Sequence, residues 1–123
     1  MNENKQSPIT NRWGEVSPER PEVEHFPLWQ GRPGAAYSHH AQITSVGDRL
    51  YASWSLGDIN EDDVGQRMVM AVSDDAGETW SQPAPVADRR PGRLAEAVIT
   101  ASGIRPHEGA LVAYYGCYEY TEE

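Results

Sequence analysis

The fold is decided by residues 73–80, which read Ser73-Asp74-Asp75-Ala76-Gly77-Glu78-Thr79-Trp80. The carboxylate of Asp75 is short enough to accept hydrogen bonds from backbone N–H groups of its own turn, and Gly77 permits a positive φ. Ser73 and Thr79 add hydroxyls, and Trp80 adds a large apolar ring. The stretch predicts a tight turn held by its own side chains, and the apolar run before it predicts the strand that enters the turn.

Alternating apolar residues predict further strands around this turn. The expected strands are residues 41–46, 50–56, 68–72 and 84–87. The first two flank Gly47-Asp48, which is typical of a β-hairpin. Pro83 and Pro85 confine the last strand to the edge of a sheet. Residues 37–88 are therefore expected to form one four-stranded antiparallel meander.

A partial second unit is expected over residues 89–123. Its β-branched and aromatic runs predict two strands, at residues 97–101 and 110–118. Residues 102–109 contain two glycines and a proline and are expected to be the turn between them. Residues 1–36 are rich in Pro and Glu and are expected to be an N-terminal arm and entry segment.

Composition excludes several classes of protein. The chain of 123 residues carries 10 Lys and Arg against 19 Asp and Glu, a formal charge of −9. Nucleic acids and anionic membranes require a basic surface, so neither is an expected partner. The single Cys117 cannot form an internal disulfide and is expected to be a small buried apolar residue. No apolar run is long enough to span a membrane, and the polar start lacks the apolar segment of a signal peptide, so the chain as given is expected in the cytoplasm.

The octapeptide at 73–80 resembles the Asp box of sialidases and of bacterial-neuraminidase-type repeats. The matching positions are Ser73, Asp75, Gly77, Thr79 and Trp80. The resemblance implies a β-propeller, in which the box links the third and fourth strands of a blade as a structural element. The expected fold is therefore all-β, with about one and a half antiparallel propeller blades. Because propellers close with at least four blades, we expect an N-terminal fragment of a longer protein, or self-association through open blade faces.

Blade topology predicts which residues meet. Alternate turns of an antiparallel blade lie at opposite ends, so His39 and His40 are expected near the acidic loop 58–67, away from the Asp box. The second unit is expected to add residues to the same end from the start of its first strand and from the end of its second. These are Arg90, Arg93, Glu96, Tyr118, Glu119 and Tyr120. Imidazole, carboxylate, guanidinium and phenol groups suit proton transfer and the binding of an acidic sugar.

The two histidines are the candidate catalytic residues. Neighbours on a strand point to opposite sides, so only one is expected to face the site, and His40 is favoured over His39. The candidate substrate-binding residues are Arg67, Asp62, Asp63, Tyr118 and Glu119. The alternatives are a solvated acidic loop for the aspartates, an ion pair for Arg67, and packing for the tyrosines. No cofactor is expected, and no metal, because no third ligand follows the histidines at a recognisable spacing.

The resemblance extends over residues 37–120 and also suggests a branch. Sialidases of the usual kind begin the first blade with an Arg-Ile-Pro segment whose arginine binds the sialic acid carboxylate. Here the segment reads His39-His40-Ala41-Gln42. This is similar to propeller enzymes that cleave rhamnosyl-glucuronate linkages, where a histidine is the implied acid or base. The expected function is a glycoside hydrolase or polysaccharide lyase acting beside an acidic sugar, with this chain inactive alone. A non-catalytic carbohydrate-binding module and an exo-sialidase are the alternatives.

Overall fold

The computed structural model describes residues 20–121, in which all regular secondary structure is β-strand. The strands are β1 (Tyr37–Val46), β2 (Arg49–Gly57), β3 (Arg67–Ser73), β4 (Ala84–Ala87), β5 (Ala97–His107) and β6 (Ala110–Glu119). Strands β1 to β4 form one antiparallel sheet in sequence order, and β5 and β6 form a second. The predictions of an all-β chain and of a four-stranded meander are confirmed. The first 19 residues of the expected arm, and residues 122–123, lie outside the described part.

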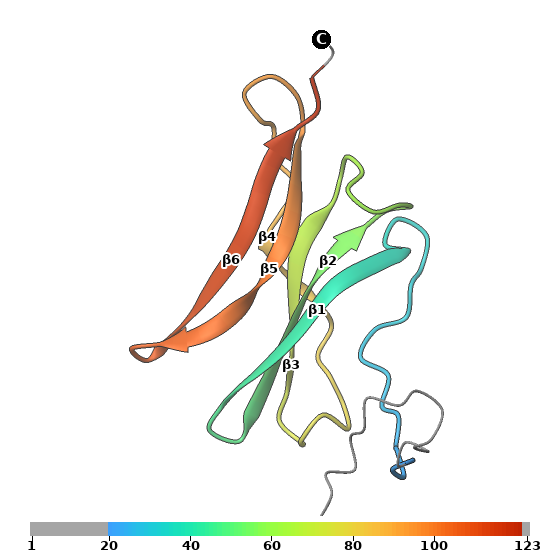
Figure 1. Ribbon diagram of the computed structural model, residues 1–123, viewed down its shortest axis with the longest axis vertical. Coiled ribbons are helices and arrows are strands. Elements are labelled where there is room, and N and C mark those ends of the chain that lie inside the picture. The colour runs from blue at the N-terminus through green and yellow to red at the C-terminus, as the bar shows by residue number, and fades with distance from the viewer. Residues whose placement is uncertain (1–19, 122–123) are drawn as a thin grey trace, which may run out of the picture.

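The two sheets pack against each other through β5, which contacts β1, β2 and β3 (Figure 1). Side chains alternate along a strand, so each strand of the first sheet contributes side chains to both faces of that sheet. On one face of the first sheet, Met68 packs with Ile99, Ala101 and Ile104 of β5. Within residues 20–121 there is no helix long and apolar enough to cross a membrane.

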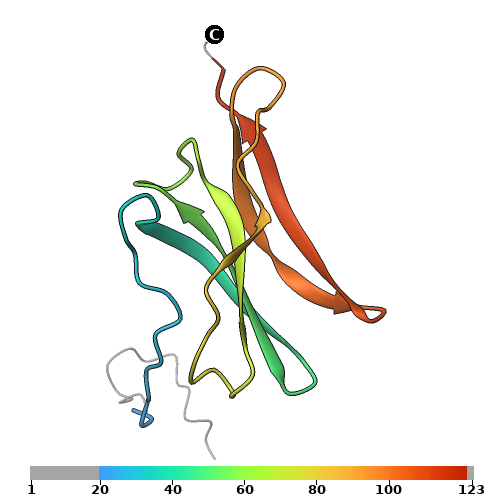
Figure 2. The ribbon, with the colours of Figure 1, turned by 180° about the vertical axis from the view of Figure 1, so that it is seen from behind.

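The opposite face of the first sheet is covered by the chain itself. Trp54 and Leu56 of β2 pack there with Val69 of β3. Residues 28–35 and the partly buried ring of Trp80 lie over them, and Figure 2 shows the entry segment running alongside the sheet. The four-stranded sheet is thus the central layer, with residues before β1 on one side and the β5–β6 hairpin on the other.

Polar groups also connect the two sheets. The side-chain nitrogen Nε2 of Gln66 donates to the carbonyl of Ile99 at 3.0 Å, and the Ile99 N–H donates to the Gln66 carbonyl at 3.3 Å. The N–H of Ala101 donates to the hydroxyl of Ser55 at 2.8 Å. Gln66 and Ser55 are fully buried. Each bond satisfies a backbone group that would otherwise be buried without a partner.

The expected turn at residues 102–109 is wrong. Strand β5 continues to His107, and only Glu108 and Gly109 turn the chain. Gly103 does not end the strand but sits at a β-bulge, where its φ of 120° lies in a region that glycine adopts readily. Pro106 pairs with Leu111 near the end of the hairpin. Gly103 and Pro106 are typical of turns, but strand β5 accommodates both.

The Asp-box turn is bonded as expected. Oδ1 of Asp75 accepts hydrogen bonds from the Ser73 hydroxyl at 2.7 Å and from the Thr79 N–H at 2.9 Å. The Ser73 hydroxyl accepts from the Gly77 N–H at 2.9 Å, and Trp80 Nε1 donates to the Gly77 carbonyl at 3.0 Å. Gly77 has a φ of 93°. The turn lies at the end of the sheet opposite the loops 58–66 and 88–96 (Figure 1).

Strand β6 is largely open to solvent. It exposes Tyr114, Tyr115 and Tyr118, and it pairs only with β5 among the residues described. Cys117 lies on this strand and is exposed. The expectation of a buried Cys117 is therefore wrong, because no further strand covers this side of β6 within residues 20–121, although the exposed Arg90 donates to Cys117 Sγ at 3.3 Å.

Ile99 tests the packing between the sheets. Its side chain is fully buried, so Ile99→Ala is expected to lower the free energy of unfolding by about 2–5 kcal/mol. Ile43→Ala is the matched control, because Ile43 also lies on a strand but is 60% exposed, and it is expected to cost less than about 1 kcal/mol. Urea unfolding followed by circular dichroism measures both. Equal losses would contradict the assignment of Ile99 to the core.

Asp75 predicts a pH dependence of stability. Hydrogen bonds from the Thr79 hydroxyl and N–H, and then from Ser73, lower the pKa of Asp75 to about 2 from 3.8. A lowered pKa means that the charged form of Asp75 stabilises the fold. This stabilisation is complete above about pH 4 and is lost as the pH falls through about 2. Asp75→Asn is expected to lower Tm at neutral pH. The difference in Tm between the variant and the native chain is expected to shrink as the pH falls. Glu78→Gln, in the same turn, should have the same Tm as the native chain at each pH.

Candidate functional site

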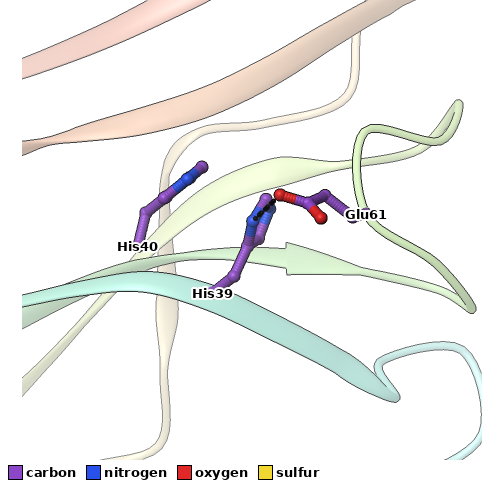
Figure 3. A group of neighbouring side chains, drawn as sticks. All are labelled: His39, His40 and Glu61. Carbon is purple, nitrogen blue, oxygen red and sulfur yellow. Dashed lines mark hydrogen bonds and ion pairs between the residues drawn. The ribbon is translucent and has the colours of Figure 1, made fainter.

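His39 is held by both of its ring nitrogens. Its Nδ1 lies 3.0 Å from Oε1 of Glu61 (Figure 3), and its Nε2 lies 2.9 Å from Oε1 of Gln66. The imidazole is 11% exposed, whereas the Glu61 side chain is 54% exposed. Strand β1 supplies the histidine, and the loop between β2 and β3 supplies both partners. The expected meeting of His39 with the acidic loop is confirmed.

The bonds of Gln66 fix the position of a proton on His39. Gln66 Oε1 accepts from the Asp62 N–H at 2.8 Å, while Gln66 Nε2 donates to the Ile99 carbonyl. A backbone N–H can only donate and a carbonyl can only accept, so the orientation of the amide is determined. Nε2 of His39 must therefore carry a hydrogen in order to donate to Gln66. Nδ1, which faces Glu61, is the ring atom left to exchange a proton or to bind a cation.

His40 lies beside His39 instead of on the other side of the strand. The pairing of β1 with β2 shifts between His39 and Gln42, and His40 has a φ of 56°. Their ring centroids are 4.0 Å apart, and both side chains leave β1 on the same side (Figure 3). The expectation that only one histidine faces the site is wrong, because a β-bulge breaks the alternation of side chains. His40 is exposed.

Glu61 completes a group that could hold a metal ion. One ligand atom from each of His39, His40 and Glu61 lies within 4.8 Å of the others. The sequence showed no third ligand because Glu61 follows β2 and reaches back to β1 only when the hairpin forms. The hydroxyl of Tyr37 also donates to Glu61, at 3.5 Å.

Asp62 connects this group to the second sheet. Its Oδ1 accepts from Gln66 Nε2 and from the Thr100 hydroxyl, each at 3.2 Å, and its carbonyl accepts from the Tyr120 hydroxyl at 2.9 Å. Burial of Asp62 opposes its ionisation, but hydrogen bonds from Tyr118, Gln66 and Thr100 outweigh it, and the pKa of Asp62 lies below its usual value. Asp62 is therefore a carboxylate that the surrounding donors keep ionised.

Tyr118 is kept in its protonated form. Partial burial, together with the nearby Asp62 carboxylate, raises the pKa of Tyr118 to about 12. Its ring packs edge-to-face on Tyr120, with centroids 5.7 Å apart. Tyr118 therefore stays protonated near neutral pH, at the end of β6 that adjoins the acidic loop.

The remaining predicted binding residues are engaged elsewhere. Glu119 accepts from the N–H groups of Arg93, Leu94 and Ala95 at 2.5–2.7 Å, and these bonds lower the pKa of Glu119. Asp63 is exposed and accepts from the Val64 N–H.

Arg67 forms an ion pair inside the loop. It lies 3.2 Å from Asp58, which also pairs with Arg89. It donates as well to the carbonyls of Gly65 and Gly34. Of the two interpretations open for Arg67, a clamp for substrate or an ion pair, the structure contains the ion pair.

A separate hollow of about 420 Å³ lies at the other end of the molecule. Val46, Tyr51 and the β5–β6 turn line it. It is remote from the histidines, so the candidate site is the open surface around His39.

Two functional residues were not found from the sequence. Gln66 and Thr100 lie at the centre of the hydrogen-bond network, but a glutamine before a strand and a threonine within one give no sequence signal. What the network provides is an imidazole with a fixed tautomer, an ionised carboxylate and two phenol donors at one surface. Such a surface can transfer protons and bind a polar ligand.

No protein-family profile matches the chain, and neither the curated proteins nor the solved structures include a match to it.

Gln66 tests the network. Gln66→Leu keeps the approximate volume but removes the partners of the Ile99 carbonyl, the Asp62 N–H and His39. Unpaired buried groups are costly, so the free energy of unfolding is expected to fall by at least about 2 kcal/mol. Gln82→Leu, at an exposed position, is the matched control and should change it by less than about 0.5 kcal/mol. Chemical denaturation measures both, and a neutral Gln66→Leu would contradict the network.

Proposed function

We propose that the surface around His39 is the active surface of a sialidase-like propeller enzyme that acts on a glycosidic bond next to an acidic sugar. The observation that carries the proposal is the convergence of His39, His40, Glu61, Asp62 and Tyr118 at one end of two stacked sheets. These residues come from three separate segments of the chain: β1, the loop between β2 and β3, and β6. The Asp-box turn, which has a structural role, lies at the opposite end.

The propeller part of the proposal is supported by the arrangement of the sheets. Strands β1 to β4 are joined by successive hairpin-like connections, as in a propeller blade, and the Asp-box turn joins β3 to β4. The second sheet packs face to face on the first and begins with β5 as the nearest strand. In a propeller, further blades would cover the exposed face of β6.

The chemical roles follow from exposure and bonding. His40 is exposed and is the proposed acid or base toward the sugar. His39, with its proton on Nε2 bound to Gln66, positions Glu61 and shares a proton with it through Nδ1. The hydroxyl hydrogens of Tyr118 and Tyr120 are engaged by Asp62, so their phenol oxygens are left to accept hydrogen bonds from sugar hydroxyls. Arg90 and Arg93 are exposed in the loop 88–96 at the same end, where they supply positive charge for a sugar carboxylate.

An exo-sialidase fits less well. The arginine expected at the start of the first blade of a sialidase is replaced by His39-His40, and Arg67 and Arg89 are both paired with Asp58. A non-catalytic carbohydrate-binding module is the second candidate. The exposed tyrosine rings of β6 favour it, because flat aromatic rings can stack on sugar rings.

The test of the enzyme is turnover of an oligosaccharide that ends in rhamnosyl-glucuronate. The chain is assayed alone and as part of any longer protein that contains it. Both reactions release rhamnose; hydrolysis leaves a saturated glucuronate, whereas elimination leaves an unsaturated uronate that absorbs ultraviolet light. His40→Ala is expected to lower kcat by about 100-fold or more, because general acid–base catalysis contributes at least that much.

His107→Ala is the matched control, since His107 is an exposed histidine at the other end of the hairpin. It should leave turnover unchanged. Binding of the oligosaccharide without turnover would favour the binding module. Release of sialic acid from a sialoside would instead support the exo-sialidase, and unchanged turnover in His40→Ala would remove that residue from catalysis.

A further inference from the structure

We propose that His39, His40 and Glu61 bind one zinc ion. The three side chains come from β1 and from the loop after β2, and they converge over the β-bulge (Figure 3). Two imidazole nitrogens and one carboxylate oxygen are a ligand set that zinc takes readily, and three protein ligands leave a coordination position open.

His39 is prepared for coordination through Nδ1. Its Nε2 donates to Gln66, whose amide is fully buried and fixed by the Ile99 carbonyl. In metal sites a ligating histidine usually donates its other N–H to such an acceptor, which fixes the ring and its tautomer. The donor atom of His39 is therefore presented in advance.

The contact between His39 and Glu61 is favourable only when a proton or a cation lies between the two groups. In the neutral ring with hydrogen on Nε2, Nδ1 is an acceptor, and Oε1 of the ionised Glu61 is also an acceptor. The two atoms lie 3.0 Å apart. Either a second proton on His39 or a cation between the groups makes this approach favourable. The adjacent ring of His40, at 4.0 Å between centroids, offers a third ligand to a cation there.

His40 is placed by an uncommon backbone conformation. A residue other than glycine seldom adopts a φ of 56°, and a histidine at this bulge turns its ring to the side of His39. The ligand atoms lie within 4.8 Å of one another, whereas bonds of about 2.1 Å in a tetrahedron bring ligands to about 3.4 Å. His40 and Glu61 are exposed, so their side chains can close this difference while His39 stays fixed.

Zinc binding is a separate state of the surface described above, because a His40 nitrogen that coordinates the ion cannot at the same time exchange a proton with a sugar. A bound ion would take the place of the proton between His39 and Glu61, and it would also engage His40. Its open position would suit a water molecule or the carboxylate of an acidic sugar, and only this last step rests on the proposed function.

The experiment is calorimetric titration of Zn²⁺ into the untagged chain after treatment with a chelator. One ion per chain is expected to bind. His40→Ala and Glu61→Gln are each expected to weaken binding at least tenfold, since even partners outside the ligand set contribute that much. Both positions are exposed, and circular dichroism checks that the variants stay folded. The matched controls are His107→Ala and Glu108→Gln, which alter another adjacent histidine–glutamate pair, 3.9 Å apart, and should leave affinity unchanged.

A second measurement identifies the ligand atom. In nitrogen-15 spectra of the histidine rings, Zn²⁺ should shift Nδ1 of His39 while its Nε2 keeps the proton that Gln66 accepts. The proposal is overturned if the native chain shows no saturable binding, if the controls weaken binding as much as the site variants, or if Nε2 is the coordinated atom. Because no sugar is present, a failure of the enzymatic proposal would leave these results intact, and the reverse also holds.

Discussion

The buried amide of Gln66 is the interaction on which the rest of the structure depends. It bonds to β5 through Ile99, to the acidic loop through Asp62 and to β1 through His39. An amide has both donors and an acceptor, so one side chain can satisfy groups of opposite kind. A carboxylate or a lysine at this position would leave part of the set unpaired. The packing of the sheets, the shape of the loop and the tautomer of the histidine are consequently set by one residue.

The acidic side chains of the molecule have different roles. Asp58 is paired with two arginines, and Glu119 accepts hydrogen bonds from three backbone N–H groups. Both therefore stabilise loops. Glu61 is exposed, and within residues 20–121 its hydrogen-bond partners are His39 and Tyr37. This difference, more than the number of carboxylates in the loop, distinguishes the group available for chemistry from those that maintain the fold.

The order of the strands and the ends at which their connections lie could be predicted, because alternation and turn residues are local properties of the sequence. The length of β5 could not, because Gly103 and Pro106 lie within the strand. His39, the acidic loop and Tyr118 were accordingly expected at one surface. The side on which His40 lies could not be predicted, because a β-bulge depends on how β1 pairs with β2. The central place of Gln66 and the exposure of Cys117 likewise depend on which strand packs on which face. Three-dimensional packing, rather than local sequence preference, decided each of these.

The strand order has a consequence for how the chain folds. Every pair of neighbouring strands is also consecutive in sequence, so each pairing closes only a short loop and loses little chain entropy. Such local contacts allow rapid folding, and β1–β2 and β5–β6 can form as independent hairpins. The docking of β5 on the first sheet is the long-range event, and it must remove water from Gln66 and Ser55 as it occurs. We therefore expect the folding barrier to lie at this desolvation, after both hairpins have formed.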